Sequence, residues 1–254
     1  MLSATSLLAG NVDAMLVDLC EALGAPELTF DRNRTPSERR RAAMAGEADL
    51  VWSCGLLAAK TQATGELRGT IRLAPIFSDR DGPTYHSVLV ARAAGPASLN
   101  DAAGSVLAIN ERESWSGHHA LRDLLAGRDA SRQPFFSRTI VTGSHAASLR
   151  AVSSGAADLA AIDDTVWSWM QVRGRPDGLR VIDQTRDWPA PPLVFSARLA
   201  PEHADRLESR LLELRPTRVP GLHGFRPARA SDYARMLEIA ESGEDLLRTT
   251  ARPR

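Results

Sequence analysis

The sequence predicts an α/β protein with two lobes, in which mostly parallel sheets are flanked by helices and a ligand cleft lies between the lobes. Apolar runs alternate with helical patterns along most of the 254 residues, as they do in consecutive β-α units. Residues 81–85 contain a Gly-Pro turn signal, and residues 188–192 contain three prolines, so both segments are typical of crossovers. A chain that leaves one lobe and returns at two crossovers places a ligand site between them. We therefore assign residues 1–83 and 190–254 to one lobe and residues 84–189 to the other.

The first lobe is predicted from short apolar runs and from helix start and stop signals. Residues 11–23 carry methionine and leucine at helical spacing and are followed by glycine and proline, which end helices. Thr35, Pro36 and Glu38 match a capped helix start, and Gly55 opens a further helix. Strands are predicted here over residues 1–8, 28–31, 49–53 and 71–77.

The second lobe shows the same alternation. Its strands are predicted over residues 85–92, 105–110, 138–141, 158–162 and 179–183, and its later helices over residues 144–154 and 163–171. A polar loop over 111–117 leads into another helix, which ends near residue 125. Residues 193–196 form the last predicted strand, and the chain beyond residue 201 predicts helices joined by a loop over 216–227.

Composition excludes several classes of partner. Lys+Arg and Asp+Glu both total 31, so a neutral protein has no general attraction to nucleic acid or acidic membranes. No apolar window of about 18 residues predicts membrane insertion. The first ten residues lack a basic secretory signal, so the sequence as written predicts a cytoplasmic protein, or a periplasmic one if a leader has been removed. Neither zinc-ligand spacing nor a nucleotide-binding fingerprint is present, so no metal and no cofactor is expected.

Ser114, Trp115, Ser116 and Gly117 lie between a predicted strand and a predicted helix. Helix N-termini present free N–H groups and a partial positive charge. The two hydroxyl groups and a glycine that admits close backbone approach suit a tetrahedral anion. The simpler interpretation, that one serine only caps the helix, stays open.

Thr142, Gly143, Ser144 and His145 occupy the same position in the next β-α unit. His145 can donate a hydrogen bond to an anion or take up a proton, although a capping Ser144 beside an exposed histidine is an alternative. The ends of successive parallel strands converge on one crevice. The two turns together therefore predict an anion site better than either does alone.

Four further residues are candidates at strand ends or crossovers. Asp163 and Asp164 start a helix, where one of them is expected to act as the cap and the other is left open. Tyr85 lies at the first crossover and either reaches the ligand or packs in the core. Ser53 ends another strand and is a candidate for the facing wall. A catalytic triad of serine, histidine and aspartate is disfavoured, because no nucleophile elbow is present.

The segment 84–171 resembles the phosphate, phosphite and phosphonate substrate-binding family of ABC transporters, and weaker similarity covers most of residues 1–200. The matching pieces are Tyr85-His86-Ser87-Val88-Leu89-Val90, Ala108-Ile109-Asn110, Ser114-Trp115-Ser116-Gly117, Val141-Thr142-Gly143-Ser144-His145 and Ala160-Ala161-Ile162-Asp163, in the family's order and spacing.

This resemblance implies a type 2 periplasmic-binding-protein fold and a phosphonate held by the serine loop. It implies that His145 and Tyr85 help the serine loop to hold the phosphonate and that Trp115 contacts it through its backbone. It also implies that Asp163 can contact an amino group of the ligand. The chain departs from the family pattern at Trp115, where a small hydroxyl residue is usual between the serines, and at His118, where tyrosine is frequent. It also lacks the family's leader, and so resembles the leaderless members most.

The leading hypothesis is a solute-binding protein that clamps a small oxyanion, such as a phosphonate or phosphate, and has an ABC permease as its partner. Two alternatives stay open. One is a cytoplasmic enzyme of the lyase or cofactor-biosynthesis type, with His145 as its acid-base group. The other is a ligand-gated sensor that binds a protein partner after closure.

Overall fold

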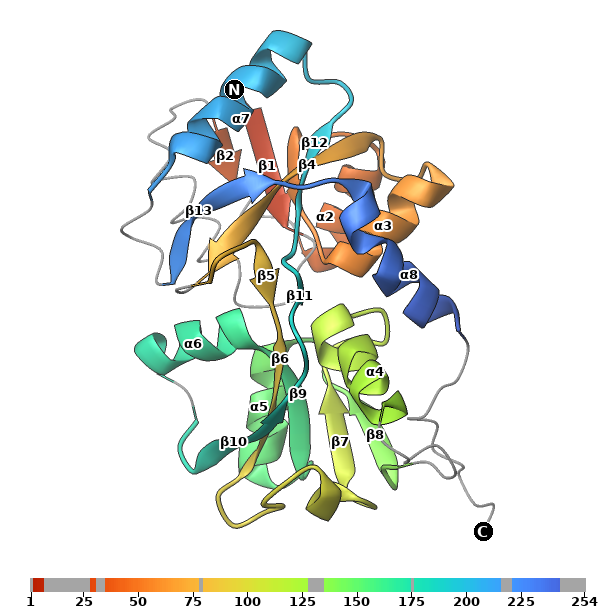
Figure 1. Cartoon of the computed structure of the whole chain (residues 1–254), viewed down its shortest axis with the longest axis vertical. Coiled ribbons are helices and arrows are strands. Elements are labelled where there is room, and N and C mark those ends of the chain that lie inside the picture. Colours follow the sequence, from red (N-terminus) through yellow and green to blue (C-terminus); the bar gives the residue numbers. More distant parts are fainter. Residues whose placement is uncertain are drawn as a thin grey trace. The chain divides into compact units, whose positions relative to one another are not determined.

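The chain divides into two compact units, each with its own sheet and helices (Figure 1). One unit is built from Met1–Tyr85 and Trp188–Glu238, and the other from His86–Asp187 and the residues from Ile239 on. The computed structural model describes residues 2–6, 28–30, 35–77, 80–127, 135–174, 176–215 and 221–242. The predicted helix over 11–23 lies outside these residues. The expected α/β class with two lobes is confirmed.

The first unit contains a six-stranded sheet in the order β13-β4-β12-β3-β1-β2. Its strands are β1 (Leu2–Ser6), β2 (Leu28–Phe30), β3 (Leu50–Trp52), β4 (Gly69–Phe77), β12 (Leu193–Ser196) and β13 (Leu222–Pro227). Strand β1 runs parallel to β2 and β3, whereas β12 and β13 pair antiparallel with their neighbours. A separate two-stranded ladder joins β5 (Thr84–Tyr85) to β11 (Trp188–Pro189).

A local capping signal explains the start of one helix of this unit, and a tertiary contact explains the start of another. Helix α2 (Pro36–Met44) begins with the predicted capping box, in which Thr35 and Glu38 satisfy each other's backbone N–H groups. Helix α3 (Gly55–Thr64) begins at a glycine that touches Tyr233, because a Cβ there would lie 2.6 Å from the tyrosine ring. The described part of this unit also contains α7 (Pro201–Glu213), the short 3-10 turn η3 (Ala230–Tyr233) and most of α8 (Ala234–Glu241), whose last residues, from Ile239 on, belong to the other unit.

Strand β13 corrects the predicted loop over 216–227, so residues 193–196 are not the last strand. It pairs with β4 through a register shift between Leu222 and Gly224. Gly224 has φ +146°, a conformation that favours glycine. This irregularity interrupts the alternation of buried and exposed residues by which a strand is recognised in sequence.

The second unit contains a five-stranded sheet in the order β10-β6-β9-β7-β8. Its strands are β6 (Ser87–Arg92), β7 (Val106–Ile109), β8 (Arg138–Val141), β9 (Leu159–Asp163) and β10 (Leu179–Gln184). Strand β7 is parallel to β8 and β9, while β6 is antiparallel to β9 and β10. Both sheets are therefore mixed, which differs from the expected mostly parallel arrangement.

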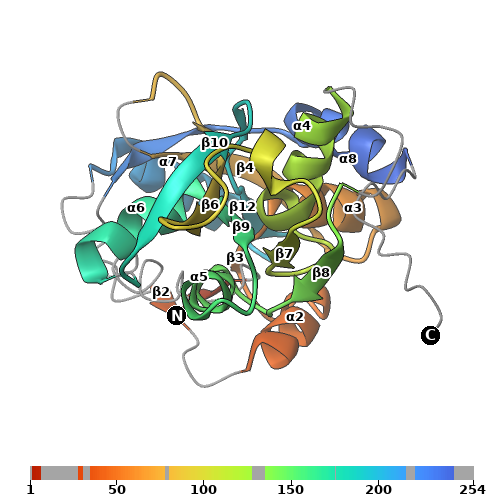
Figure 2. The same ribbon diagram turned by 90° about the horizontal axis from the view of Figure 1, so that it is seen from below.

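Helices cover both faces of this sheet, with α4 (Ala120–Ala126) on one face and α5 (His145–Ser154) on the other (Figure 2). The 3-10 turn η1 (Asn100–Ala102) and helix α6 (Asp164–Arg173) complete the unit with the π-helix η2 (Trp115–His119). Its apolar core is fully buried and includes Leu89, Leu99, Leu107, Leu121, Phe136 and Leu159. This core lies wholly within the continuous segment from β6 to β10.

Two predicted boundaries in this region need correction. The helix expected after the loop 111–117 begins earlier, because η2 starts at Trp115. The strand predicted over 85–92 is interrupted at His86, so β5 belongs to the first unit and β6 to the second. Among the described helices, none has both the length and the apolar composition that crossing a bilayer requires.

Candidate ligand-binding site

Polar residues of the second unit gather at one edge of its sheet. Parallel strands β7, β8 and β9 end at this edge, where ligand sites of α/β proteins usually form. Strand β6 runs the other way, so its first residue, Ser87, pairs with Asp163, the last residue of β9. Asn110 directly follows β7, and the turn 142–144 follows β8. The topology therefore brings polar side chains from four strands to the same edge.

The serine segment forms the first turn of η2. Ser114 caps it, because its Oγ accepts a hydrogen bond from the Gly117 N–H at 3.1 Å. The His119 N–H donates to the Ser114 carbonyl at 3.2 Å, a bond across five residues that defines a π-turn. Such turns are rare in proteins, and many of those that are found lie at functional sites. The capping interpretation thus holds for Ser114 and leaves the hydroxyl of Ser116 for another role.

Ser116 lies next to His145, although 29 residues separate them in sequence. The distance between Ser116 Oγ and His145 Nε2 is 3.2 Å, and both side chains are buried. The Nδ2 atom of Asn110 lies 3.5 Å from the same ring nitrogen. Because an amide nitrogen can only donate, Nε2 is the acceptor of the ring and the neutral imidazole carries its proton on Nδ1.

The second turn delivers His145 from the other side. Gly143 has φ +87°, which favours glycine, and its N–H donates to the Asn110 carbonyl at 2.8 Å. Ser144 caps α5, because its Oγ accepts from the Ala147 N–H at 3.1 Å. His145 is the first residue of that helix and is buried, not exposed as the capping alternative supposed.

Burial sets the charge of His145. It lowers the pKa of the imidazole from 6.5 to about 4, against the opposing effect of the Ala161 backbone. The ring is therefore neutral at pH 7 in the ligand-free protein. A negatively charged ligand beside the ring would favour the protonated form, which is also the form able to donate through Nε2.

Trp115 and Gly117 serve the packing of this turn. The Trp115 side chain is fully buried and stacks on His119, with ring centroids 6.1 Å apart. Gly117 allows a close approach, because a Cβ at this position would lie only 1.7 Å from Asn110 Oδ1. Any side chain at residue 117 would displace Asn110 or the turn itself.

Asp163 is the cap of α6. Its Oδ1 atom accepts from the Thr165 N–H at 2.9 Å, the Thr165 hydroxyl at 2.6 Å and the Val166 N–H at 3.4 Å. Burial raises the pKa of Asp163, and these hydrogen bonds oppose that shift. The expected capping aspartate of the pair is thus Asp163, and this role occupies one of its two oxygens.

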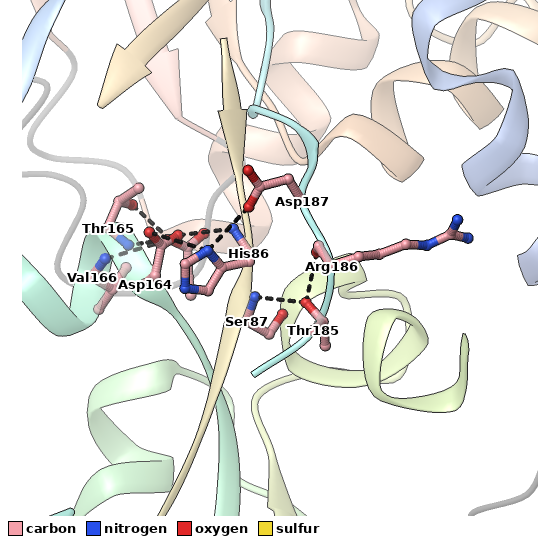
Figure 3. Close-up of polar contacts among 9 residues, drawn as sticks. His86, Ser87, Asp164, Thr165, Val166, Thr185, Arg186 and Asp187 are labelled. Atoms are coloured by element: carbon pink, nitrogen blue, oxygen red, sulfur yellow. Dashed lines mark hydrogen bonds and ion pairs between the residues drawn. The ribbon is translucent and has the colours of Figure 1, made fainter. Parts of the chain in front are cut away.

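Asp164 fixes the start of β6 instead. Its Oδ1 accepts from the His86 N–H at 3.0 Å, and its own N–H donates to the His86 carbonyl (Figure 3). The His86 ring lies 3.2 Å from Asp187, measured from Nδ1 to Oδ1. Beside them, the Ser87 N–H donates to the Thr185 hydroxyl at 3.0 Å (Figure 3). These contacts fix the start of β6 against the residues that follow β9 and β10, so they hold the two ends of the chain segment that builds the second unit's sheet.

Tyr85 and Ser53 belong to the first unit. Tyr85 is 1% exposed and pairs with Trp188 in the ladder of β5 and β11. Ser53 is fully buried after β3, and its hydroxyl donates to the Cys54 carbonyl at 3.2 Å. Their contact with a ligand stays a prediction.

Asn110 is a residue of this site that sequence reasoning did not predict. It is 4% exposed and lies beside both Gly117 and His145. A polar residue directly after an apolar strand was the available signal. That signal is weak, because asparagine is also common in ordinary turns.

A family model matches residues 6–233 of the chain and is described as an ABC transporter, phosphonate, periplasmic substrate-binding protein. The match spans most of the sequence and includes both turns of the site. No curated protein matches the chain.

Three solved structures share the fold. A binding protein component of an ABC phosphonate transporter from Pseudomonas aeruginosa has a TM-score of 0.69 at 16% identity, covering 94% of this chain and 84% of that one. PhnD1 from Prochlorococcus marinus, solved with methylphosphonate, has a TM-score of 0.72 at 19% identity, covering 94% and 96%. XAC2383 from Xanthomonas citri, solved with ATP, has a TM-score of 0.61 at 17% identity, covering 94% and 95%. At these identities the likeness establishes the fold alone.

Proposed function

Because the chain belongs to the family of phosphonate-binding periplasmic substrate-binding proteins of ABC transporters, we propose that it binds a small oxyanion at the edge of the second unit's sheet. The ligand class is a phosphonate or a phosphate-like anion. Ser116 and His145 contact its oxygens, with the backbone of Trp115 and Gly117 beside them. Tyr85, Ser53 and Asp163 are candidates for further contacts.

The observation that carries this proposal is the meeting of two donor-rich turns. Ser116 Oγ and His145 Nε2 come from consecutive strand-to-helix turns and lie 3.2 Å apart in a buried setting. Oxyanions need several directed donors, and hydrogen bonds to a charged group are stronger than those between neutral groups. The methylphosphonate bound in the Prochlorococcus structure supports this chemical class.

The family also supports a place in transport. Its description is that of a periplasmic component of an ABC transporter, so we infer a permease as the partner and the periplasm as the compartment. None of the matches described above is named as an enzyme or as a sensor. Neither alternative from the sequence gains an observation in its favour.

Calorimetry with methylphosphonate, phosphite, phosphate, aminoethylphosphonate and ATP tests the ligand class. We expect saturable binding of at least one small oxyanion, and a roughly tenfold to hundredfold weaker Kd for Ser116→Ala, because a hydrogen bond to a charged ligand is lost. Ser154→Ala is the matched control, since this exposed serine ends the same helix that His145 begins. Folded protein that binds none of the small anions would refute the proposed class, and ATP binding alone would replace it with a nucleotide.

A further inference from the structure

Asn110 connects the two turns of the site through its backbone. It directly follows β7, and its carbonyl accepts the Gly143 N–H at 2.8 Å. The preceding residue, Ile109, accepts the Thr142 N–H at 2.9 Å. The end of β7 therefore fixes the turn that delivers His145.

The side chain of Asn110 connects the same two turns a second time. Its Nδ2 atom lies 3.5 Å from His145 Nε2. Its Oδ1 atom lies against Gly117, where a Cβ would come within 1.7 Å. One end of the carboxamide thus faces the histidine, and the other faces the turn that carries Ser116.

The hydrogen bonds of the Asn110 side chain indicate that the stability of the fold alone does not account for an asparagine at this position. Asn110 is 4% exposed, and among the described residues its Oδ1 atom has no hydrogen-bond partner. A buried carbonyl oxygen without a partner destabilises the folded state, and an apolar side chain of similar shape avoids that cost. A polar group kept in such a place is expected to act on its neighbours.

We propose that Asn110 is a positioning residue of the ligand site, which adds to burial in keeping His145 neutral and fixes the separation of the two turns. An amide N–H that faces Nε2 stabilises the lone pair there and disfavours its protonation. The lone pair in turn accepts the hydrogen bond of the Ser116 hydroxyl. This inference rests on the proposed function for its purpose, but its effect on His145 exists without ligand.

Other charged groups near His145 stay unchanged when Asn110 is replaced. Asp163 ends β9, and His118 and His119 lie in η2; both elements pack near the ring. Strand β7 carries no titratable residue, and the arginines of α5 and β6 are Arg150, which is exposed, and Arg92, which ends its strand. A change in the titration of His145 between variants therefore reports on Asn110.

An NMR titration of the ligand-free full chain tests the proposal, with the His145 signal assigned by its loss in His145→Gln. Asn110→Leu keeps the ring buried but removes the amide donor, so we expect the pKa of His145 to rise above about 4 while burial still holds it below 6.5. Asn110→Asp places a carboxylate there and is expected to raise proton affinity further, by roughly tenfold or more. Thr185→Val is the control, because it removes a buried hydrogen bond of the same unit that does not involve His145.

An unchanged pKa of His145 in both Asn110 variants overturns the proposal. If Asn110→Leu does not fold, Asn110→Ala carries the same comparison with a shorter side chain that also lacks a donor. The spacing role is tested by thermal unfolding. Gly117→Ala is expected to lower Tm, and Asn110→Ala in the same chain is expected to restore part of the loss, because it removes the atom that the new Cβ meets. If the losses of Tm in the two single variants simply add in the double variant, residue 117 and Asn110 are not in direct contact.

Calorimetry with methylphosphonate then separates this inference from the proposed function. If the parent protein binds no oxyanion but the pKa of His145 responds to Asn110, the ligand class fails and the positioning role stands. If the parent binds methylphosphonate, we expect the pH profile of binding to shift to higher pH in Asn110→Leu, because His145 then takes up more readily the proton that it donates to the anion. Equal affinities and equal pH profiles in the parent and in Asn110→Leu contradict a positioning role for Asn110.

Discussion

At the scale of single residues, the burial of His145 has a consequence that is independent of any ligand. Its pKa is about 4 in the folded protein and 6.5 in an ordinary setting. Above pH 6.5 the ring is neutral in both the folded and the unfolded chain, so it does not affect the stability. Between pH 6.5 and 4 only the unfolded chain takes up the proton, and stability is lost as the pH falls.

We predict that this loss amounts to about 3 kcal/mol of unfolding free energy between pH 6.5 and pH 4. Urea unfolding at several pH values measures it. His145→Gln is the comparison, since glutamine is polar and does not titrate. The parent and the variant should differ in the slope of stability against pH over this window. Parallel curves would show that His145 titrates normally in the folded state.

Residue patterns predict the caps of the two turns and the meeting of Ser116 with His145, but not the contacts of Asn110. Ser114 and Ser144 are caps, as the simpler interpretation of each turn allowed. The proximity of Ser116 to His145 was expected from strand order, because ends of parallel strands share an edge. The role of Asn110 was not predicted, because it depends on the approach of Gly117, which has no sequence pattern of its own.

At the scale of elements, α6 begins at a carboxylate that caps the helix and that the family resemblance also assigns to the ligand. Asp163 Oδ1 accepts from three donors at the helix start. The family resemblance instead assigns this residue to a ligand amino group. The described geometry therefore predicts a larger effect of Asp163 on stability than on ligand choice.

We predict that Asp163→Ala lowers the unfolding free energy by about 1 kcal/mol, the usual effect of losing a cap. Any change in Kd should be equal for methylphosphonate and aminoethylphosphonate, because the carboxylate acts through the helix. Asp163→Asn keeps a capping oxygen and is the control, with a smaller loss of stability expected. A selective loss of aminoethylphosphonate binding would assign the second oxygen of Asp163 to the ligand.

Elements with strong local signals were predicted, and elements that depend on tertiary pairing were not. The capping box of α2 and the apolar runs of β7 and β9 are local features, and the structure contains them. Strand β13 is set by its pairing with β4 and contains a bulge, so its sequence was interpreted as a loop. The π-turn of η2 likewise has no local pattern that separates it from an ordinary helix start.

At the scale of the whole molecule, the two units differ in how the chain builds them. The second unit takes its sheet and its apolar core from one continuous segment, residues 86–187. The sheet of the first unit is built from two separate segments of the chain, because β12 lies between β3 and β4, and β13 lies beside β4. Strands β1 to β4 alone lack the strand that joins β3 to β4.

We predict that an isolated fragment of residues 86–187 folds cooperatively, since about 100 residues with their own core are within the usual size of a domain. A fragment of residues 1–85 should not fold, because it lacks β12 and leaves the edges of β3 and β4 unpaired. Circular dichroism during urea unfolding distinguishes the two. The larger fragment should also keep the depressed pKa of His145, because β7, β9 and η2, which lie around the buried ring, are all within it. Cooperative unfolding of 1–85, or a disordered 86–187, would contradict this division of the chain.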